Sequence, residues 1–493
     1  MFSLLTRFMD ALIGPVEAKD VPHFLFVFFL FPGLVILRPE LITAGGATLA
    51  SFAFFLAIFV YAAAVLYVRR RRPVYVVDFS CYDPPYNCRV PCAAFEEHAN
   101  LIFHKESERH LVDFSVRVLH LSGLGEETAL PPVTHYIPPV PTLQLAREEA
   151  EMIMYSTVDS LLKKTGVDPV EIDAVVVNCS IFAPNPSLAD MLMNRFGFRP
   201  DTKCINLSGM GCSAEFIALD AARSHLQVNP ESRALVVSSE IITPVCYFGK
   251  ERSMMVSNCL FRMGAAAVLL SNRSSDRTRS KYTMTNLVRT HIGADDNAFN
   301  CVGLREDDDG ILGMMLSKDL PRNAAKALET NIRTFAPIVL PLSEKLRYVL
   351  MNVIVRKLYN PKRPPYVPNF KTVFDHFCVH AGGVPLIDQV EKSLRLTPYD
   401  VEASRMTLYR IGNTSSSSVW YELGYTEAKG RMKKGDRVWQ IALGGGFKCI
   451  SAAWKCNRSV SPESITDGPW PRCIHKFPVE VRNVTTMKVD GLN

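Results

Sequence analysis

The sequence predicts an α/β fold built from two related halves and preceded by a hydrophobic amino-terminal region. Beyond residue 74, short β-branched apolar runs alternate with longer stretches of helical periodicity, which is typical of buried strands covered by helices. Segments of the second half align with segments of the first at one constant offset. The amino-terminal region differs from the rest because two long runs there carry no charged side chain.

The two uncharged runs predict a transmembrane helical hairpin within residues 1–74. Val21–Leu37 has 17 residues and Leu41–Val68 has 28, and a spanning helix needs about 20. Arg38-Pro39-Glu40 separates the runs, and Arg69–Arg72 follows at once, which indicates that both ends of the hairpin face the cytosol. For the shorter run, a re-entrant segment is the alternative. A cleaved signal peptide is disfavoured, because no A-x-A site follows the longer run.

The body is predicted to alternate strands and helices, with a turn-rich tail over residues 458–493. Short apolar runs indicate buried strands, and longer segments with a period near 3.6 indicate helices. The expected strands are Asp173–Asn178, Lys203–Leu207, Ala234–Ser238, Ala265–Leu270, Val373–Val379, Met406–Tyr409 and Val438–Leu443. The expected helices are Leu145–Lys164, Ser187–Phe196, Ser213–Leu226, Ser317–Leu346 (broken) and Leu386–Leu394, with loops at 274–279 and 357–368.

A shift of 201 residues relates the two halves. It places Ile205–Ala214 over Met406–Ser415, so that Cys212 falls on Asn413, and it sets Cys179 over His380. Few residues are identical, but the matched positions carry reactive or polar side chains in both halves. We therefore expect residues 75–280 and 281–457 to be related halves that meet around one site.

Composition excludes several classes of protein. A net charge of +6 over 493 residues is too weak to indicate a nucleic-acid partner. The 13 cysteines include no CxxC pair, so zinc ribbons and thioredoxin-like sites are unsupported and no metal is expected. Their odd number favours free thiols in a reducing compartment.

Cys212 is the candidate nucleophile. It lies at a predicted strand-to-helix turn, where Gly209 and Gly211 permit a tight bend. The following helix would place the thiol at a helix amino terminus, which favours the thiolate. The alternative is a small buried cysteine without a reactive role.

Polar residues at other strand ends are candidates to assist it. His380 follows the strand Val373–Val379, at the sheet edge where functional groups usually lie, and His376 shares its strand face. Asn413 precedes a serine run and is open to a second interpretation as a helix N-cap. Gly444, Gly445 and Gly446 follow the strand Val438–Leu443, and they offer either backbone N–H groups or only a turn.

Longer motifs around these residues resemble the plant 3-ketoacyl-CoA synthases. The resemblance runs from about Arg72 to Trp454. It implies a thiolase-like αβαβα fold of two pseudo-symmetric halves, in agreement with the internal repeat. The motifs are PVYVVDFSCY (73–82), NLSGMGCSA (206–214), SNCLFRMGAAAVLLSNR (257–273), HFCVHAGG (376–383), RIGNTSSSSVWYEL (410–423) and LGGGFKC (443–449).

By this resemblance Cys212, His380 and Asn413 are the catalytic residues, in a set similar to that of type III polyketide synthases. Phe261 matches the phenylalanine that those enzymes place between cysteine and substrate. Two further histidines shared by the family match His291 and His376. The chain departs from the family at Tyr409, where many members have histidine, and at 383–386, where a basic residue usually follows the glycines.

The resemblance also implies the reaction, which is the condensing step of very-long-chain fatty acid elongation. Malonyl-CoA and a long-chain acyl-CoA would give 3-oxoacyl-CoA, CO2 and CoA through an acyl-cysteine, without a cofactor. The expected setting is the endoplasmic reticulum membrane, with the catalytic domain in the cytosol, as a homodimer beside elongase reductases and dehydratase. The alternatives are a type III polyketide-synthase-like enzyme and a weakly active scaffold subunit of an elongase complex.

Overall fold

The computed structural model describes residues 72–359, 362 and 364–480. Residues 73–339 and 365–480 form one compact unit, and residues 340–359 belong to a second unit. The predicted hairpin, with its runs Val21–Leu37 and Leu41–Val68, lies outside the described residues. Within them, no helix is both long and apolar enough to cross a bilayer.

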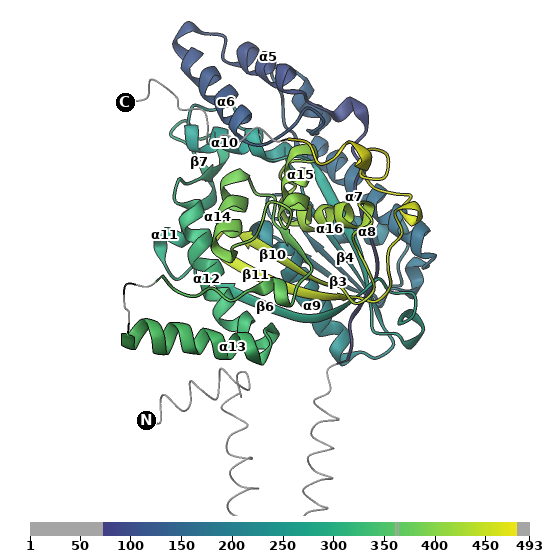
Figure 1. Cartoon of the computed structure of the whole chain (residues 1–493). Helices are drawn as coiled ribbons and strands as arrows, with labels where there is room; N and C mark the ends of the chain where they lie inside the picture. The colour runs from purple at the N-terminus through teal and green to yellow at the C-terminus, as the bar shows by residue number, and fades with distance from the viewer. Residues whose placement is uncertain (1–71, 360–361, 363, 481–493) are drawn as a thin grey trace, which may run out of the picture. The chain divides into compact units, whose positions relative to one another are not determined.

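The larger unit is organised around a nine-stranded mixed sheet with the order β3-β2-β4-β5-β1-β6-β11-β10-β9 (Figure 1). β7 and β8 form a separate antiparallel pair. The strands are β1 (Tyr75–Cys81), β2 (Ala174–Asn178), β3 (Lys203–Leu207), β4 (Arg233–Glu240), β5 (Gly264–Ser271), β6 (Tyr282–His291), β7 (Val302–Glu306), β8 (Leu312–Leu316), β9 (His376–Val379), β10 (Arg437–Gly444) and β11 (Lys448–Cys456).

The pairing pattern of the sheet repeats on either side of the junction between β1 and β6. From β1 outward, β5 and β4 follow in antiparallel pairs and β2 then pairs parallel with β4. From β6 outward, β11 and β10 follow in antiparallel pairs and β9 then pairs parallel with β10. The repeated pattern agrees with the offset of 201 residues, which sets β2 over β9.

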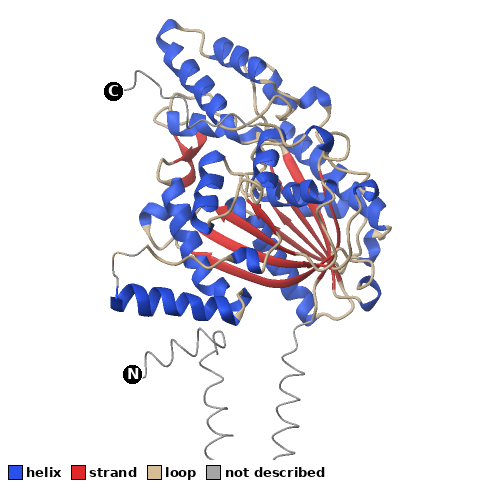
Figure 2. Cartoon of the chain, viewed as in Figure 1, coloured by secondary structure: helices blue, strands red, loops and turns tan. Residues whose placement is uncertain are grey.

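Helices cover both faces of this twisted sheet (Figure 2). α9 contacts β2 and β4 of one half and β11 of the other, while α16 contacts β9, β10, β1 and β5, so both helices lie between the two halves of the sheet. α7 and α8 pack on the outer face of the first half, and α12 packs on β6 and β11. The helices are α5 (Cys92–Ile102), α6 (Arg109–Leu121), α7 (Leu143–Thr165), α8 (Leu188–Phe196), α9 (Ala214–Val228), α10 (Arg252–Leu260), α11 (Asp296–Phe299), α12 (Leu320–Val339), α13 (Leu342–Tyr348), α14 (Val384–Leu394), α15 (Glu402–Arg410) and α16 (Ser418–Ala428).

Local sequence explains where several of these helices begin and end. Ser187 and Asp190 form a capping box that starts α8, and Gly197 ends it with a φ of +64°. The predicted break in Ser317–Leu346 falls between α12 and α13, at Pro341, which precedes the first residue of α13. After α13 the helix continues as a π-helical segment, Val349–Tyr359, so part of the loop predicted at 357–368 is helical.

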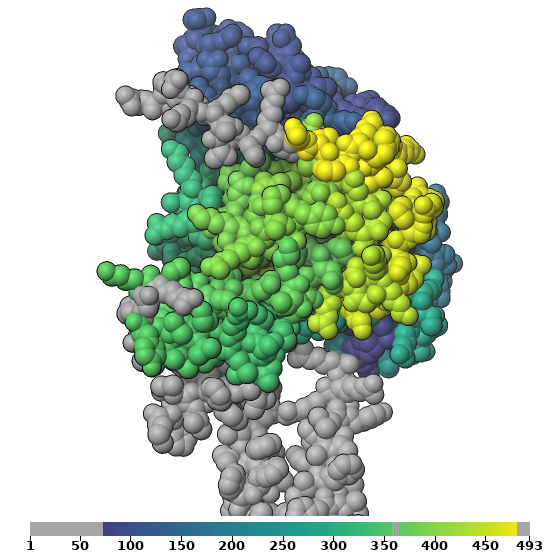
Figure 3. All heavy atoms as spheres, in the orientation of Figure 1, coloured from purple at the N-terminus to yellow at the C-terminus, as the bar shows by residue number. Residues whose placement is uncertain are grey.

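One predicted strand is wrong, because Met406–Tyr409 lies within α15. Its residues Thr407 and Tyr409 favour strands, but Ala403, Met406 and Arg410 recur at helical spacing and are buried. The other six predicted strands correspond to strands of the sheet. The carboxyl-terminal residues up to 480, yellow in Figure 3, spread over the surface of the larger unit, where the buried Trp470 ring packs edge-on against Tyr425 at 5.0 Å.

Candidate active site

Cys212 lies in a single 3₁₀ turn, Gly211–Ser213, between β3 and α9. Gly211 has a φ of +70°, and an added Cβ there would lie 2.7 Å from the backbone nitrogen of Gly445. Glycine is therefore required both by the backbone conformation and by the close approach of the loop after β10. The Cys212 side chain is partly buried and packs against an apolar cluster that includes Ile242 and Phe261.

The Cys212 thiol keeps its proton at neutral pH. Burial raises the pKa of the thiol to about 11, while a hydrogen bond with the Ser415 side chain and the positive charge of Lys448 oppose the increase. The carboxylate of Glu240 adds to the increase. Burial therefore outweighs the preference for thiolate that the helix amino terminus was expected to provide.

His380 follows β9 directly and is almost completely buried. Its backbone N–H donates to the Ile441 carbonyl at 2.9 Å, which fixes the residue beside the end of β10. Nδ1 lies 2.7 Å from the Ser418 hydroxyl, and Nε2 faces Gly382, where an added Cβ would lie 2.9 Å away. Burial lowers the pKa of His380 to about 4, so the imidazole is neutral near pH 7.

Asn413 is held by backbone and side-chain contacts. Its N–H donates to the Leu260 carbonyl at 3.2 Å, and its backbone pairs with Phe261 in an isolated parallel bridge. The side-chain Oδ1 accepts the N–H of Ser415 at 2.9 Å, and Nδ2 donates to the Gly382 carbonyl over a long 3.4 Å. Nδ2 carries a second N–H that is free for another acceptor.

A continuous chain of contacts joins these three residues. The turn Gly211–Ser213, which holds Cys212, packs against the turn Ser415–Ser417, and the N–H of Ser415 bonds to the Asn413 side chain. That side chain in turn bonds to Gly382, which packs against His380. The structure thus brings together a thiol, a carboxamide and an imidazole that lie far apart in the sequence.

The glycine loop after β10 lies against the same turn. An added Cβ on Gly444 would lie 2.6 Å from the Ser213 backbone nitrogen, so Gly444 and Gly445 approach both sides of Cys212. Gly446 has a φ of +97° and lies farther along, beside Lys448. Backbone N–H groups of the loop are therefore next to the nucleophile.

The two further histidines lie apart from this chain of contacts. His291 is exposed at the end of β6, paired with Lys448 of β11 and close to Gly446. Burial, with the charge of Lys448, lowers the pKa of His291. His376 lies at the other end of β9 from His380, and its Nε2 is 2.9 Å from the Asp436 carboxylate. The geometry of His376 favours a structural role.

Sequence reasoning missed Ser415 and Glu240. Ser415 is buried with a φ of +55°, a left-handed conformation that is unusual for serine, and its hydroxyl donates to Glu240 at 2.9 Å. Glu240, at the end of β4, also accepts the N–H groups of Ser180 and Ile181 at 2.9 and 2.8 Å. Burial raises the pKa of Glu240. The available signal in the sequence was Glu240 itself, an acidic residue just after a predicted apolar strand.

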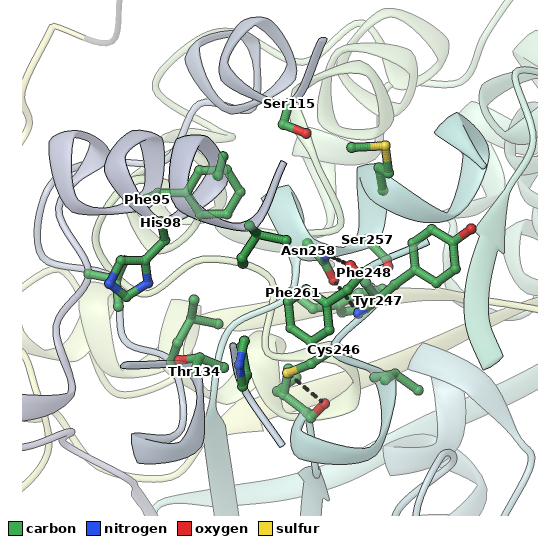
Figure 4. Close-up of a pocket in the computed structure, with 18 of the residues that line it drawn as sticks. Phe95, His98, Ser115, Thr134, Cys246, Tyr247, Phe248, Ser257, Asn258 and Phe261 are labelled. Carbon is green, nitrogen blue, oxygen red and sulfur yellow. Dashed lines mark hydrogen bonds between the residues drawn. The ribbon is translucent and has the colours of Figure 1, made fainter. Parts of the chain in front are cut away.

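An apolar pocket, drawn in Figure 4, lies next to the apolar cluster against which Cys212 packs. It encloses about 800 Å³ of empty space, part of it open to solvent. Phe95 and His98 of α5 point into it from one side and Phe261 from the other. The pocket shares Ile242 and Phe261 with the cluster that Cys212 contacts, and it shares Tyr247 and Met255 with a second apolar cluster. The pocket thus connects the cluster beside the nucleophile with a second apolar cluster.

Most polar side chains on the pocket wall are satisfied by the protein. The Asn258 side chain bonds to the backbone N–H and carbonyl of Tyr247, and the Tyr247 hydroxyl bonds to Asp307. The hydroxyls of Thr134 and Ser257 donate to nearby backbone carbonyls at 2.7 and 2.6 Å. The wall therefore presents mainly apolar surface, which suits a hydrocarbon chain.

Comparison with known proteins places this geometry in a family. The model described as FAE1/Type III polyketide synthase-like protein matches residues 66–358, and that of the 3-oxoacyl-[acyl-carrier-protein] synthase III carboxyl-terminal region matches residues 371–456. With the mixed sheet and its helices, these matches show a thiolase-like α/β fold.

Curated relatives from Arabidopsis thaliana extend over nearly the whole chain. 3-Ketoacyl-CoA synthase 6 is 51% identical over 481 residues, which cover 95% of each chain. 3-Ketoacyl-CoA synthase 5 is 54% identical over 433 residues, 88% of this chain and 87% of that one. 3-Ketoacyl-CoA synthase 17 is 46% identical over 489 residues, 96% of this chain and 100% of that one. By fold, by the convergence of Cys212, His380 and Asn413, and by this identity, the chain belongs to the 3-ketoacyl-CoA synthase family.

Proposed function

We propose that this chain is the condensing enzyme of very-long-chain fatty acid elongation. It joins malonyl-CoA to a long-chain acyl-CoA and yields 3-oxoacyl-CoA, CO2 and CoA. The observation that carries the proposal is the set of contacts that links the Cys212 turn through Asn413 to His380, beside an apolar pocket. The names of its relatives support the same activity.

In the first half-reaction, Cys212 takes the acyl group from acyl-CoA. Because both Cys212 and His380 are neutral near pH 7, the thiol proton passes to His380 Nε2 as sulfur attacks the thioester carbon. The C–S bond to CoA breaks, and His380 returns the proton to the departing sulfur. The product is an acyl-cysteine whose chain occupies the apolar pocket.

In the second half-reaction, malonyl-CoA loses CO2 and its thioester oxygen becomes an enolate oxygen. The free N–H of Asn413 and the Nε2–H of His380 hold that oxygen. The Ser418 hydroxyl beside Nδ1 is able either to donate or to accept, so it supports the tautomer that each half-reaction needs. Loss of CO2 itself creates the carbanion, so neither a strong base nor a cofactor is invoked.

In the last step the enolate carbon attacks the acyl thioester. The backbone N–H groups of Cys212 and of the loop Gly444–Gly446 stabilise the oxyanion, because this loop packs directly on the Cys212 turn. Collapse of the tetrahedral intermediate breaks the bond to Cys212 sulfur and releases 3-oxoacyl-CoA, and the departing thiolate takes up a proton from water to restore the thiol.

The setting proposed for this reaction is the cytosolic face of the endoplasmic reticulum membrane. The uncharged runs before Arg69–Arg72 support a membrane anchor, and the 13 cysteines, all free, suit a reducing compartment. We propose a homodimer that works beside elongase reductases and dehydratase, since each condensation must be followed by reduction and dehydration of its product.

The deciding experiment expresses the full chain in membranes that lack this activity. Malonyl-CoA and a panel of acyl-CoAs of different length are supplied, and the extracted products are separated by chain length. We expect 3-oxoacyl products two carbons longer than the acyl-CoA, and none from Cys212→Ala. Products of repeated extension and cyclisation would instead support a polyketide-synthase activity, and parity between the parent and Cys212→Ala would favour a scaffold.

A further inference from the structure

A helical segment of the smaller unit exposes a long apolar stripe. α13 and the π-helical segment that continues it span Leu342–Tyr359. Within it, Leu342, Leu346, Leu350 and Ile354 recur every four residues, and this spacing places them along one side of a helix. Leu346 is 54% exposed and Leu350 is 49% exposed. A helix of a soluble domain normally buries such a face.

The positive charge of the chain is concentrated in this segment, whose net charge is +3, and in the residues that directly flank it. Residues 340–364 contain six Lys or Arg and one Glu, so they carry a net charge of +5 against +6 for all 493 residues. The guanidinium of Arg347 lies 3.8 Å from the single acid, Glu344. An apolar stripe within a basic helix is the pattern of helices that lie in the interface of a membrane with anionic headgroups.

A second copy of this chain fits the stripe less well, because residues 340–364 of the two copies would bring +5 against +5. Anionic lipid offers both the apolar layer and the opposite charge.

We propose that α13 and its continuation to Tyr359 lie in the interface of an anionic bilayer, with the stripe Leu342, Leu346, Leu350 and Ile354 facing the acyl chains. The basic residues of the segment then meet phosphate and carboxylate headgroups. This inference rests on the proposed membrane setting of the enzyme. It assigns a second lipid contact to the carboxyl-terminal half, in addition to the anchor expected within residues 1–74.

Tryptophan quenching in the full-length protein tests this placement, because the four native tryptophans are all buried. The protein carries Leu346→Trp or Leu350→Trp and is reconstituted in phosphatidylcholine vesicles with or without phosphatidylserine. We expect quenching by doxyl-labelled lipid, little quenching by aqueous iodide, and a stronger lipid effect with phosphatidylserine. The matched control Val228→Trp, at an exposed position of α9, should respond to iodide instead.

A charge variant separates the electrostatic contribution to the lipid contact from the apolar contribution. Lys345→Gln combined with Lys362→Gln should reduce the additional lipid quenching that phosphatidylserine causes, while quenching in phosphatidylcholine stays the same. Iodide quenching of the introduced tryptophans, or protection from both quenchers, would overturn the proposal. The second result would show that protein covers the stripe.

Co-sedimentation with the vesicles distinguishes a failure of the proposed membrane setting from a failure of the proposed interfacial placement of this segment. Protein that fails to sediment contradicts the proposed membrane setting. Protein that sediments, but whose introduced tryptophans respond to iodide, contradicts only the interfacial placement of this segment.

Discussion

Two small residues, Ser415 and Gly382, hold the reacting side chains in place. Ser415 lies in a turn that packs on the Cys212 turn, and its backbone N–H bonds to the Asn413 side chain. Gly382 accepts a bond from Asn413 and, having no side chain, lets His380 Nε2 approach. Since Asn413 is the shared partner, its amide has a defined position before any substrate binds.

Replacing the amide should separate the two half-reactions. Asn413→Asp keeps the size of the side chain but removes the N–H that would hold the enolate oxygen, so we expect decarboxylation to fall by about 10²–10³. Acyl transfer to Cys212 should persist. Intact-protein mass spectrometry measures the acyl-enzyme, and release of labelled CO2 measures decarboxylation.

Two further variants serve as controls for that experiment. Cys212→Ala should lose acyl capture entirely. His376→Gln should retain both half-reactions, because His376 lies at the far end of β9 and bonds to Asp436. Equal loss of both half-reactions in Asn413→Asp would contradict the proposal that Asn413 acts in decarboxylation and not in acyl transfer.

The protonation states of Cys212 and His380 predict a pH profile for the free enzyme. Burial raises the pKa of Cys212 to about 11, so the thiolate is a minor species that increases about tenfold per pH unit below that value. Burial lowers the pKa of His380 to about 4, so His380 does not titrate between pH 6 and 9. The rate of Cys212 alkylation by iodoacetamide should therefore rise steadily over that range.

Peptide mass spectrometry follows this alkylation at Cys212 separately from the exposed Cys204, which serves as the internal control. A rate that is already constant below pH 8 would indicate a thiolate–imidazolium pair in place of two neutral groups.

Cys212, His380 and Asn413 could be predicted from the sequence because each follows a strand or a glycine turn. The residues that connect them could not be predicted. Ser415 is one of four consecutive serines, and nothing in the sequence distinguishes it from Ser416, which bonds to Asn178 instead. Its left-handed backbone and its bond to Glu240 depend on contacts between the two halves, which a local pattern does not contain.

At the scale of single elements, the turn between β3 and α9 is constrained both by its backbone conformation and by its packing. Gly211 combines a φ of +70° with the approach of Gly445, whereas Gly197 at the end of α8 has a φ of +64° and no atom within 4 Å of an added Cβ. The two glycines therefore differ in packing but hardly in backbone conformation.

Alanine at each position should separate the cost of conformation from the cost of contact. Gly197→Ala should lower the free energy of unfolding by about 1–2 kcal/mol, the usual cost of a left-handed residue with a side chain, and leave activity intact. Gly211→Ala should cost more and should also abolish acyl capture, because its Cβ displaces the glycine loop. Chemical denaturation and the acyl-enzyme assay measure the two effects. If Gly211→Ala retained acyl capture, close packing of the loop would not be required.

Elements with strong local signals were predicted well, and those defined by distant contacts were not. α7, α8 and α9 begin and end within a few residues of the expected positions. β1, β6 and β11 were missed, although β1 and β6 join the two halves of the sheet. α15 was mistaken for a strand, because four residues rich in β-formers do not reveal that α16 packs against the segment.

For the whole molecule, the repeat in the sheet explains why the site lies between the halves. β2 and β9 occupy equivalent places, so Cys179 and His380, which follow them, do as well. α9 and α16 are the corresponding central helices, and they begin after Cys212 and Asn413 respectively. The offset of 201 residues predicted this correspondence, although the segment it aligns with β3 lies within α15. The pocket, in contrast, is built from residues 90–139 and 242–261, where the sequence indicated only Phe261, through the family resemblance.

The shape of that pocket should set the length of the acyl chain. Met255 and Ser115 line it, and Met255 also belongs to the second apolar cluster, which does not include Cys212. Met255→Ala lengthens the available space, so the product distribution should shift to longer chains, at a stability cost of about 2–5 kcal/mol. Ser115→Leu fills space and should shift products to shorter chains, at a stability cost of about 1–3 kcal/mol.

Met432→Ala is the matched control, because Met432 is equally buried in a cluster remote from the pocket. It should destabilise the protein without changing product length, whereas a length shift in Met432→Ala, or unchanged products in both pocket variants, would show that the acyl chain lies elsewhere.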